Sequence, residues 1–406
     1  MKWTHNFILC LLFLKGSFTA NITEVETLYN NLLSNYNKYV RPLTSTDIPV
    51  LVNTTYSLVG IKEFDEVNGK FSVIGFFTIT WIDSRLAWDP SLYSQLYMTE
   101  LPESKVWIPN LTLINPYEKI ENLAKGLFPV TYVFNGIAYW SPGEVTSTGC
   151  EVDVTYYPFD TQSCSMMLMC WGYEPTAIVT QASDPEIGMA YYAEHGTWEL
   201  VDKKLITHLD SFHSYISIDI KMKRRPAFAV INIVLPMVFM LVLNLLVFIL
   251  PVDGGERVSY AITVLLAIAV FLTLVGDNLP KTSKPTALLS YFLLVDLVLS
   301  SLICFFVIIG MSFYYKDKKE TPVPKSLASI VRLCCHRRCT RRAENTTVVE
   351  AYDPKSSHKK VPFTDDDEEE EEVTWKMVSK CFDKFMLTSC LLIIISSTVA
   401  FFVMTM

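Results

Sequence analysis

The sequence predicts an extracellular all-β sandwich with an N-terminal helix, followed by a bundle of four membrane-spanning helices. Three observations predict this fold class. Residues 1–20 have the pattern of a secretory signal peptide. Short strand-like runs fill roughly the next 180 residues, and four long apolar stretches occupy the second half. With 406 residues and 50% apolar side chains, the chain is long enough for two folding units, one of them in lipid.

Residues 1–20 combine Lys2 with a short apolar run, Ile8 to Leu14, and small residues up to Ala20. This order is typical of a cleaved signal peptide. A membrane anchor is the alternative, but the run is too short to span a bilayer. We therefore expect residues 21–226 to form an extracellular domain, in a compartment that permits disulfides and glycans.

Residues Glu24 to Val40 place apolar side chains at helical spacing, which predicts an amphipathic helix. After Pro42 the period changes to the alternation that is typical of strands. The clearest runs are Val50–Ile61, Phe71–Ile82, Val130–Tyr139 and Ser214–Met222, separated by clusters of Asn, Gly, Pro and Asp. Many short strands predict an immunoglobulin-like β-sandwich.

Four apolar stretches follow, namely Phe228–Leu250, Ser259–Val275, Leu288–Tyr314 and Phe385–Met406. Each is about long enough to cross ~30 Å of hydrocarbon as a helix. They predict three membrane helices within residues 227–315 and a fourth within 376–406. With an extracellular start, four spans place residues 316–375 in the cytosol and the C-terminus outside. The lysines and arginines at 316–319 and 332–342 agree with this orientation.

The formal net charge of −8 is concentrated in the acidic run Asp365–Glu372, which is typical of a solvated segment. Cys334, Cys335, His336 and Cys339 have metal-like spacing, but no second ligand pair follows them. We expect no metal and no cofactor. The sequence contains no nucleophile and base motif and no phosphate loop, so we expect neither an enzyme nor a nucleic-acid partner.

The second apolar stretch carries a stripe of residues at alternating steps of three and four, which places them on one helical face. They are Glu256, Ser259, Thr263, Leu266, Val270, Thr273 and Asp277. The stripe has an acid at each end and an apolar middle. One interpretation is a polar stripe buried inside a helix bundle. We favour the other, a cation pore, because rings of acids attract cations and an apolar middle can gate by dewetting.

Two cysteines, Cys150 and Cys164, enclose thirteen residues that include Tyr157-Pro158-Phe159-Asp160. This pattern resembles the signature loop of the Cys-loop receptors, which are pentameric ligand-gated ion channels with a central pore. Three motifs extend the resemblance over nearly the whole mature chain: Trp107-Ile108-Pro109-Asn110, the strand Cys164 to Trp171, and Lys223-Arg224-Arg225-Pro226. The chain is most similar to the nicotinic acetylcholine receptor branch. The resemblance implies a Cys150–Cys164 disulfide, which leaves Cys170 as a buried free thiol.

Members of this family bind ligands between subunits, in a box of aromatic side chains that attracts an ammonium group. The resemblance implies that Trp171 lies in this box, with Phe76 and Trp140 contributed by the neighbouring subunit. Trp107 and Trp198 are interpreted as core. Ile114 stands where nicotinic subunits have a tyrosine, and Lys203–Tyr215 lacks their adjacent cysteine pair. The aromatic candidates left in that segment are Phe212, His213 and Tyr215, so the agonist is an amine, an uncharged molecule, or absent.

The stretch Gly255-Glu256-Arg257-Val258 resembles the cation-selective form of the family, because it lacks the Pro-Ala insertion of anion channels. By the same resemblance Arg257 points away from the pore. The resemblance also implies a set of residues that transmits ligand binding to the helices: Glu66, Val67, Phe159, Asp160, Arg224 and Pro280. Glu66 or Asp160 would pair with Arg224 in a partly desolvated ion pair, and a solvated surface pair is the alternative.

We therefore expect a subunit of a homo- or hetero-pentamer in the plasma membrane, with both termini outside the cell. Its partners would be identical or homologous subunits, membrane lipid, a small extracellular agonist, and permeant sodium and potassium ions, with calcium left open. Two alternatives remain: a subunit that assembles without binding agonist itself, and a membrane-anchored adhesion or binding protein whose helices conduct nothing. Sequons at Asn21 and Asn53 predict glycans. Asn345 would be cytosolic, and Asn110 occupies a position that we expect to be buried.

Overall fold

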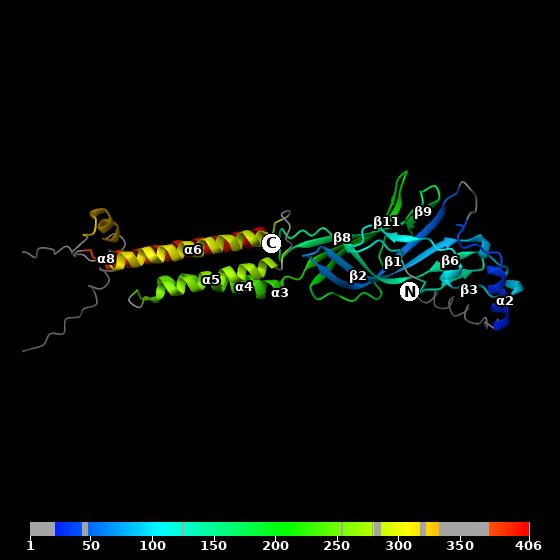
Figure 1. Cartoon of the computed structure of the whole chain (residues 1–406), viewed down its shortest axis with the longest axis horizontal. Helices are drawn as coiled ribbons and strands as arrows, with labels where there is room; N and C mark the ends of the chain where they lie inside the picture. Colours follow the sequence, from blue (N-terminus) through cyan, green and yellow to red (C-terminus); the bar gives the residue numbers. More distant parts are fainter. Residues whose placement is uncertain are drawn as a thin grey trace, which may run out of the picture. The chain divides into compact units, whose positions relative to one another are not determined.

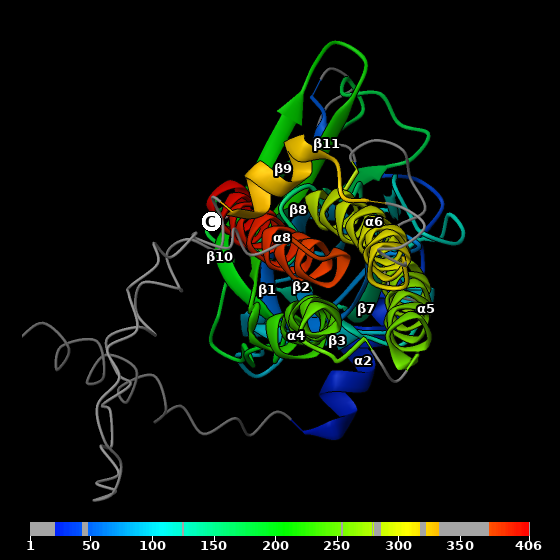
Figure 2. The same cartoon turned by 90° about the vertical axis from the view of Figure 1, so that its left-hand side faces the viewer.

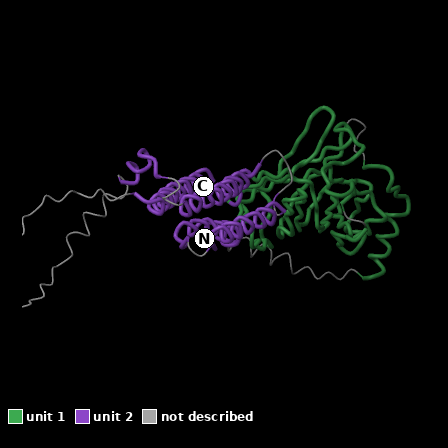
Figure 3. Tube along the Cα trace, turned by 60° about the vertical axis from the view of Figure 1, so that its left-hand side comes forward, with its two compact units in different colours: residues 1–154, 159–226, 280–285 green, residues 155–158, 227–279, 286–406 purple. Residues whose placement is uncertain are grey.

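The computed structural model describes residues 21–42, 48–123, 126–252, 255–277, 279, 286–316, 322–332 and 373–405. The predicted signal peptide, Pro280, Asn345, the acidic run and the cysteines at 334–339 lie outside the described residues. The chain divides into two units, shown in green and purple in Figure 3. The first comprises residues 1–154, 159–226 and 280–285, and the second 155–158, 227–279 and 286–406. The strands lie in the first unit and the long apolar helices in the second (Figure 1).

The first unit begins with the predicted helix, α2 (Ile22–Leu33), in which Leu28 is fully buried. The expected continuation to Val40 is wrong. The Tyr36 hydroxyl donates to Asp83 at 2.7 Å, and the Asn37 side chain accepts from the Tyr39 N–H at 3.0 Å. Because such side-chain bonds compete with helical backbone bonds, the segment after Leu33 forms turns instead.

The strands form two sheets. The first contains β1 (Val50–Asp65), β2 (Lys70–Ile82), β3 (Met98–Leu101), β5 (Val130–Val133), β6 (Ile137–Trp140), β7 (Gly143–Gly149) and β9 (Ile178–Ala182). The second contains β4 (Leu111–Leu113), β8 (Thr161–Cys170), β10 (Trp198–Leu209) and β11 (Ser214–Arg224). The strand orders are β3-β5-β6-β2-β1-β9, with β7 also paired to β2, and β10-β11-β8-β4. One buried core draws on both sheets, so the predicted β-sandwich is confirmed.

Alternation of side chains explains why these segments form strands, since successive side chains point to opposite faces of a sheet. Val52 and Leu58 on β1 are fully buried, as is Phe77 on β2, whereas the outward residues between them are not. The expected single strand Val130–Tyr139 is instead the hairpin of β5 and β6. Gly136, with a φ of +84°, makes the tight turn that a side chain would disfavour.

The two sheets are joined covalently. Cys150, directly after β7, forms the implied disulfide with Cys164 in β8. Cys170 is a free thiol and is 3% exposed, as expected. Burial raises the pKa of this thiol to about 11, so it stays protonated and unreactive at neutral pH. Trp107 and Trp198 are both buried, which confirms their interpretation as core.

Within its described residues, the second unit contains four helices that are long and apolar enough to cross a membrane: Ala227–Phe248, α5 (Glu256–Asp277), α6 (Leu288–Tyr314) and α8 (Trp375–Thr405). The first is composed of α3 (Ala227–Ala229), η4 (Val230–Val234), α4 (Leu235–Leu245) and η5 (Leu246–Phe248). The π-helical η4 lies just before Pro236, which lacks an N–H and disturbs regular α-helix. Figure 2, which looks along the helices, shows the bundle: α5 packs on α4 and α6, and α8 packs on α6 and α4.

Two of these helices are longer than the apolar stretches that predicted them. α5 begins at Glu256 and ends at Asp277, and α8 begins at Trp375 instead of Phe385. The start of α8 is held by ring stacking of Trp375 on Phe313 of α6, with 5.9 Å between the ring centroids. An apolar stretch marks the part of a helix at hydrocarbon depth and does not define the helix ends.

Candidate functional site

All seven residues of the predicted stripe lie on an exposed face of α5 in the single chain. Leu266 is 63% exposed and Val270 is 51% exposed. The opposite face, which includes Ala261, Val264 and Ile268, is buried against the neighbouring helices. The interpretation as a polar stripe buried inside this bundle is therefore wrong. An exposed helical face with carboxylates at both ends can line a water-filled path when several copies surround it.

Arg257 follows Glu256 directly but lies on the buried face of α5. Its guanidinium pairs with Asp383 of α8 at 2.9 Å and donates to the carbonyls of Leu250 (2.6 Å) and Phe248 (3.2 Å). The carboxylate and the two carbonyls thus pair with the guanidinium inside the bundle. A buried cation requires such partners. Arg257 thus points away from the exposed stripe, as the resemblance implied, and leaves the Glu256 carboxylate on that stripe.

Arg224, at the end of β11, pairs with two carboxylates in the first unit. Its guanidinium donates twice to Asp160, at 2.7 Å and 3.1 Å, and once to Glu66 at 2.9 Å. The side chains of Asp160 and Arg224 are 1% and 7% exposed, whereas that of Glu66 is 22% exposed. The expected partly desolvated pair is confirmed, and the solvated surface pair is excluded. We call Glu66, Asp160 and Arg224 the coupling triad.

Two neighbours orient the coupling triad. The Trp198 ring lies 4.3 Å from the Arg224 guanidinium carbon, so the buried tryptophan also makes a cation–π contact that the sequence did not indicate. The Gln162 amide donates to Asp160 at 2.6 Å. Burial raises the pKa of Glu66 above its ordinary value, and the attraction of Arg224 only partly opposes this rise.

Two other members of the expected coupling set, Val67 and Phe159, are adjacent to triad residues in the sequence. Val67 follows Glu66 in the turn between β1 and β2 and is 38% exposed. Phe159 precedes Asp160 and is half-buried. Residues 155–158 of the same loop belong to the second unit, where the Leu288 N–H donates to the Thr155 carbonyl at 3.0 Å. The loop between Cys150 and Cys164 is therefore divided between the two units.

The expected ligand-binding aromatics lie in different surroundings. Trp171, directly after β8, is 51% exposed, which suits a contact with a ligand. Phe76 on β2 is half-buried and packs on Tyr191, with 5.9 Å between ring centroids. The expectation for Trp140 is wrong, because its side chain is fully buried. Alternation along β6 turns Tyr139, 42% exposed, to the surface instead.

The hairpin of β10 and β11 carries the remaining aromatic candidates. Asp210 accepts from the N–H groups of Phe212 and His213, both at 2.7 Å, which shapes the tip and leaves Phe212 75% exposed. Tyr215 pairs with Met169 of β8, two residues before Trp171, so the tip and Trp171 share one end of the four-stranded sheet. The Tyr215 ring stacks on His208 at 4.5 Å.

Ile114, just after β4, is half-buried and bonds through its N–H to the Met167 carbonyl. The four-stranded sheet thus gathers Ile114, Trp171 and Tyr215, while Phe76 lies on the other sheet. Sequence reasoning missed Tyr191, which is 69% exposed and contacts Phe76. The only signal for it was a pair of adjacent tyrosines at 191–192.

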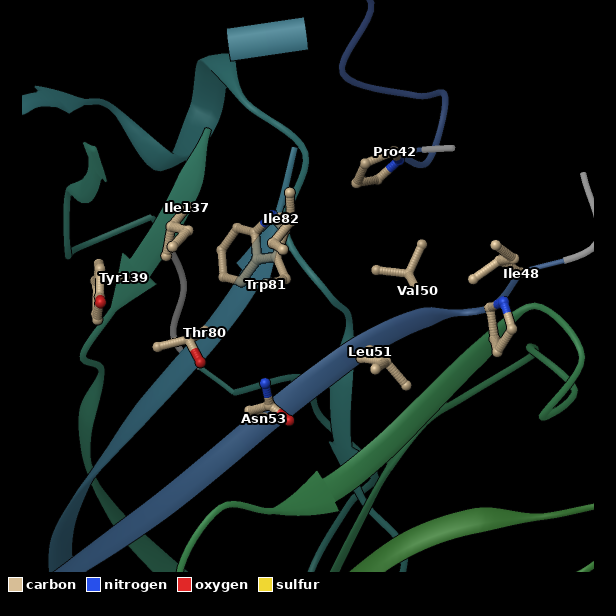
Figure 4. Close-up of a pocket in the computed structure, with 11 residues that line it drawn as sticks. Pro42, Ile48, Val50, Leu51, Asn53, Thr80, Trp81, Ile82, Ile137 and Tyr139 are labelled. Carbon is tan, nitrogen blue, oxygen red and sulfur yellow. The ribbon is translucent and has the colours of Figure 1, made fainter. Parts of the chain in front are cut away.

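A groove of about 410 Å³ lies on the β1, β2 and β6 face of the first sheet, and Figure 4 shows its lining. Asn53 lies in this groove, and its side chain accepts from Gln181 at 2.7 Å, so a glycan there would occupy the groove. Asn21 is exposed at the start of α2. Asn110 is exposed, and the expectation of a buried position is therefore wrong.

Two family descriptions match the chain. Residues 25–226 match the neurotransmitter-gated ion-channel ligand binding domain, and residues 233–372 match the neurotransmitter-gated ion-channel transmembrane region. Curated relatives include neuronal acetylcholine receptor subunit alpha-6 of Rattus norvegicus, 28% identical over 78% of this chain and 64% of the relative. Subunit alpha-2 of Rattus norvegicus is 26% identical over 79% and 65%. Subunit alpha-3 of Homo sapiens is 28% identical over 80% and 65%.

The matched region spans less than two thirds of the length of these relatives. It nevertheless includes both units of the chain, and the two family descriptions divide it near residue 226, where the sandwich ends and the apolar helices begin. The disulfide loop lies within the first match and the spans α5 and α6 lie within the second, whereas α8 begins at Trp375, after the second match ends. The chain therefore belongs to the neurotransmitter-gated ion-channel family, and it is similar to the nicotinic acetylcholine receptor subunits.

Proposed function

We propose that this chain is a subunit of a pentameric, cation-selective channel that opens when a small extracellular molecule binds between subunits. The observation that carries the proposal is the exposed face of α5. It bears Glu256 at one end, Asp277 at the other, and Leu266 and Val270 between them. In a pentamer this face would line the pore, with an apolar constriction between two rings of acids.

The charge balance near Glu256 supports cation selectivity. Five copies of Glu256 would surround a narrow mouth, where low-dielectric walls strengthen the field on a permeating ion. Arg257 does not cancel this charge, because Asp383 and two backbone carbonyls hold its guanidinium inside the bundle. Sodium and potassium ions would accumulate at the mouth, and chloride would be repelled.

The ligand site would combine two faces of the extracellular domain. Trp171 with Phe212, His213 and Tyr215 would come from one subunit, and Phe76, with Tyr191 beside it, from the next. Exposed aromatic rings attract cationic amines, and the similarity to subunits named as acetylcholine receptors places acetylcholine first among the amines to test. Ligand binding would act on the helices through the coupling triad together with Val67, Phe159 and Pro280.

We further propose a plasma-membrane protein with both termini outside the cell and its 316–375 segment in the cytosol. The family match and the four apolar helices support a membrane-spanning receptor. In this orientation Asn21 and Asn53 are available for glycosylation during export.

The test is expression of the full chain in cells that lack such channels, with current recorded during application of amines and uncharged small molecules. An agonist-evoked current that reverses near the cation potential in a sodium chloride dilution gradient is expected. Reversal near the chloride potential would overturn the cation assignment. Absence of current, despite chain at the cell surface, both alone and with related subunits, would overturn the channel proposal.

Two observations favour a second candidate, a subunit that assembles without binding agonist itself. Ile114 supplies no aromatic ring, and Trp140 is buried, so two walls of the expected aromatic box are missing. Co-expression with agonist-binding relatives would distinguish the two. In the second case Trp171→Ala would leave the agonist sensitivity of the mixed channel unchanged, whereas Leu266→Thr would still alter its gating.

A further inference from the structure

A row of side chains crosses the outward face of the four-stranded sheet beside Trp171. The register pairs His208 of β10 with Tyr215 of β11, and it pairs Tyr215 with Met169 of β8. Residues paired across strands lie on the same face of a sheet, and the alternate residues of β8 and β11 are buried in the sandwich core. Trp171 follows Met169 by two residues, so it lies on the β8 side of Tyr215, whereas His208 lies on the β10 side. Tyr215 is therefore between the exposed tryptophan and the histidine.

The rings of His208 and Tyr215 are stacked. Their centroids are 4.5 Å apart and their planes differ by 9°. The imidazole therefore covers the face of the Tyr215 ring that is turned toward β10. The opposite face is turned toward β8 and Trp171, where a cationic ligand can contact it.

The imidazole of His208 is held in place by Ser217 of β11. Its Nε2 atom lies 3.0 Å from the Oγ of Ser217, and the serine is 4% exposed. A hydroxyl can either donate or accept, so this hydrogen bond persists when the imidazole gains a proton. Protonation of His208 therefore changes the charge of the stack without requiring the side chain to move.

The positive charge of a protonated His208 has no neutralising partner. The charged groups around it have neighbours of opposite charge: Asp210 with His213 at 3.5 Å in the hairpin tip, Lys204 with Asp202 at 3.0 Å, and Asp219 opposite Lys204 in the register. β9, which also packs on β10, carries no titratable side chain. Among the residues that the structure describes, no carboxylate pairs with His208.

We propose that His208 is a specificity-determining residue that makes binding of a cationic ligand at Trp171 and Tyr215 depend on pH. Histidine is the side-chain type whose charge ordinarily changes between about pH 5 and pH 8. The neutral imidazole allows an ammonium group to contact the free face of Tyr215, and the imidazolium repels it. Acidification outside the cell thus weakens binding of an ammonium ligand and leaves binding of an uncharged ligand unchanged. This inference rests on the ligand site of the proposed function.

The size of the effect follows from the spacing of the strands. Two strand spacings of about 4.8 Å separate β10 from β8, so a cation on the β8 side of Tyr215 lies ~10 Å from the imidazole. At this distance one positive charge weakens the binding of another roughly 2- to 15-fold, for an effective dielectric constant between ~80 and ~20.

The first test is equilibrium binding of tritiated acetylcholine to membranes that contain the full chain, at about pH 7.5 and about pH 5.5. Acetylcholine is a quaternary ammonium compound, so its own charge does not change with pH. The wild-type affinity is expected to decrease roughly 2- to 15-fold at the lower pH. His208→Gln keeps a hydrogen-bonding side chain for Ser217 but does not titrate, and its affinity should be the same at both pH values. An equal decrease in this variant, or no decrease in the wild type, would overturn the proposal.

Two other histidines provide matched controls. His213 has Asp210 as its own carboxylate partner, so His213→Gln should retain the wild-type decrease on acidification. His195 lies just before the far end of β10, where its Nδ1 accepts from the N–H groups of Thr197 and Trp198, and His195→Gln should retain the decrease as well. Loss of the pH dependence in either control, with retention in His208→Gln, would assign the effect to a different histidine.

Quenching of tryptophan fluorescence by caesium ions tests the inference without an agonist. The contribution of Trp171, which is 51% exposed, is the difference in quenching between the purified full chain and Trp171→Phe. This contribution should decrease from about pH 7.5 to about pH 5.5 in the wild type but not in His208→Gln. Acrylamide is an uncharged quencher, and its quenching of Trp171 should not change with pH.

The two measurements separate this inference from the proposed function. Absence of acetylcholine binding at both pH values, together with pH-dependent caesium quenching, would refute acetylcholine as the ligand and support the role of His208. Caesium quenching of Trp171 that is independent of pH would overturn that role. An equal decrease in acrylamide quenching would also overturn it, because a movement of the chain would then explain the change.

Discussion

Replacing Asp160 with asparagine should destabilise the extracellular domain strongly. The Asp160 side chain is 1% exposed and accepts two hydrogen bonds from Arg224 and one from Gln162. The substitution keeps the size of the side chain but removes its charge, so Arg224, itself 7% exposed, loses its most buried carboxylate partner and keeps the partly exposed Glu66. Removing one partner of a buried ion pair costs about 3–5 kcal/mol.

Thermal unfolding of the purified full chain measures this loss. For a domain of about 200 residues each kcal/mol lowers the midpoint by roughly 2–4 °C, so we expect a decrease of about 10 °C. The control is Glu194→Gln, which breaks the pair of Glu194 with Arg225, the residue next to Arg224. The Arg225–Glu194 distance of 2.8 Å is close to the 2.7 Å between Arg224 and Asp160, but Glu194 is 77% exposed, so the midpoint should barely change.

The pH dependence of the same transition tests Glu66. Its pKa is raised in the folded domain above the ordinary value of 4.5, so the unfolded chain releases this proton first as pH increases. The contribution of Glu66 to stability is therefore complete below pH 4.5 and is lost as pH rises through the folded pKa. We therefore compare the unfolding midpoints of the wild type and of Glu66→Gln. The difference, wild type minus variant, should decrease as pH rises over this range.

Two results would refute the reasoning about the triad. One is a midpoint for Asp160→Asn within 2–3 °C of the wild type, which would mean that the buried pair contributes no more than a surface pair. The other is a wild-type midpoint that rises relative to Glu66→Gln as pH increases above 4.5. That rise would mean that Arg224 stabilises the Glu66 carboxylate more than burial disfavours it.

Three further predictions concern the channel. Leu266→Thr should increase basal current or agonist sensitivity, because a hydroxyl in the apolar middle of the α5 stripe favours water in the pore. Unchanged gating in this variant would indicate that the constriction lies at Val270 instead. Glu256→Ala should lower the preference for cations in reversal potentials, whereas Asp277→Asn should mainly reduce conductance at low salt, where screening is weak. Trp171→Ala should weaken the agonist response about 5- to 30-fold, equivalent to ~1–2 kcal/mol of cation–π attraction. Trp107→Phe, in the buried core, should change the response little, and equal effects of the two changes would place the ligand elsewhere.

Features that depend on local spacing were predictable from the sequence. The four spans, the stripe on α5 and the alternation of β1 and β2 follow from the fixed periods of helices and strands. The Cys150–Cys164 disulfide was implied by the resemblance of this loop to the signature loop of the Cys-loop receptors. The fold class and the face of α5 that carries Glu256 and Leu266 therefore required no knowledge of tertiary contacts.

Burial and distant pairing were decided only by the tertiary structure. Trp140 and Tyr139 are adjacent aromatics, and only the packing of β6 decides that the tryptophan is buried and the tyrosine exposed. Arg224 pairs with two carboxylates, and one of them, Glu66, is 158 residues away in the sequence. Arg257 pairs with Asp383, which is 126 residues away. Local periodicity carries no information about such separations, because charged partners are selected by the positions to which packing of the whole chain brings them.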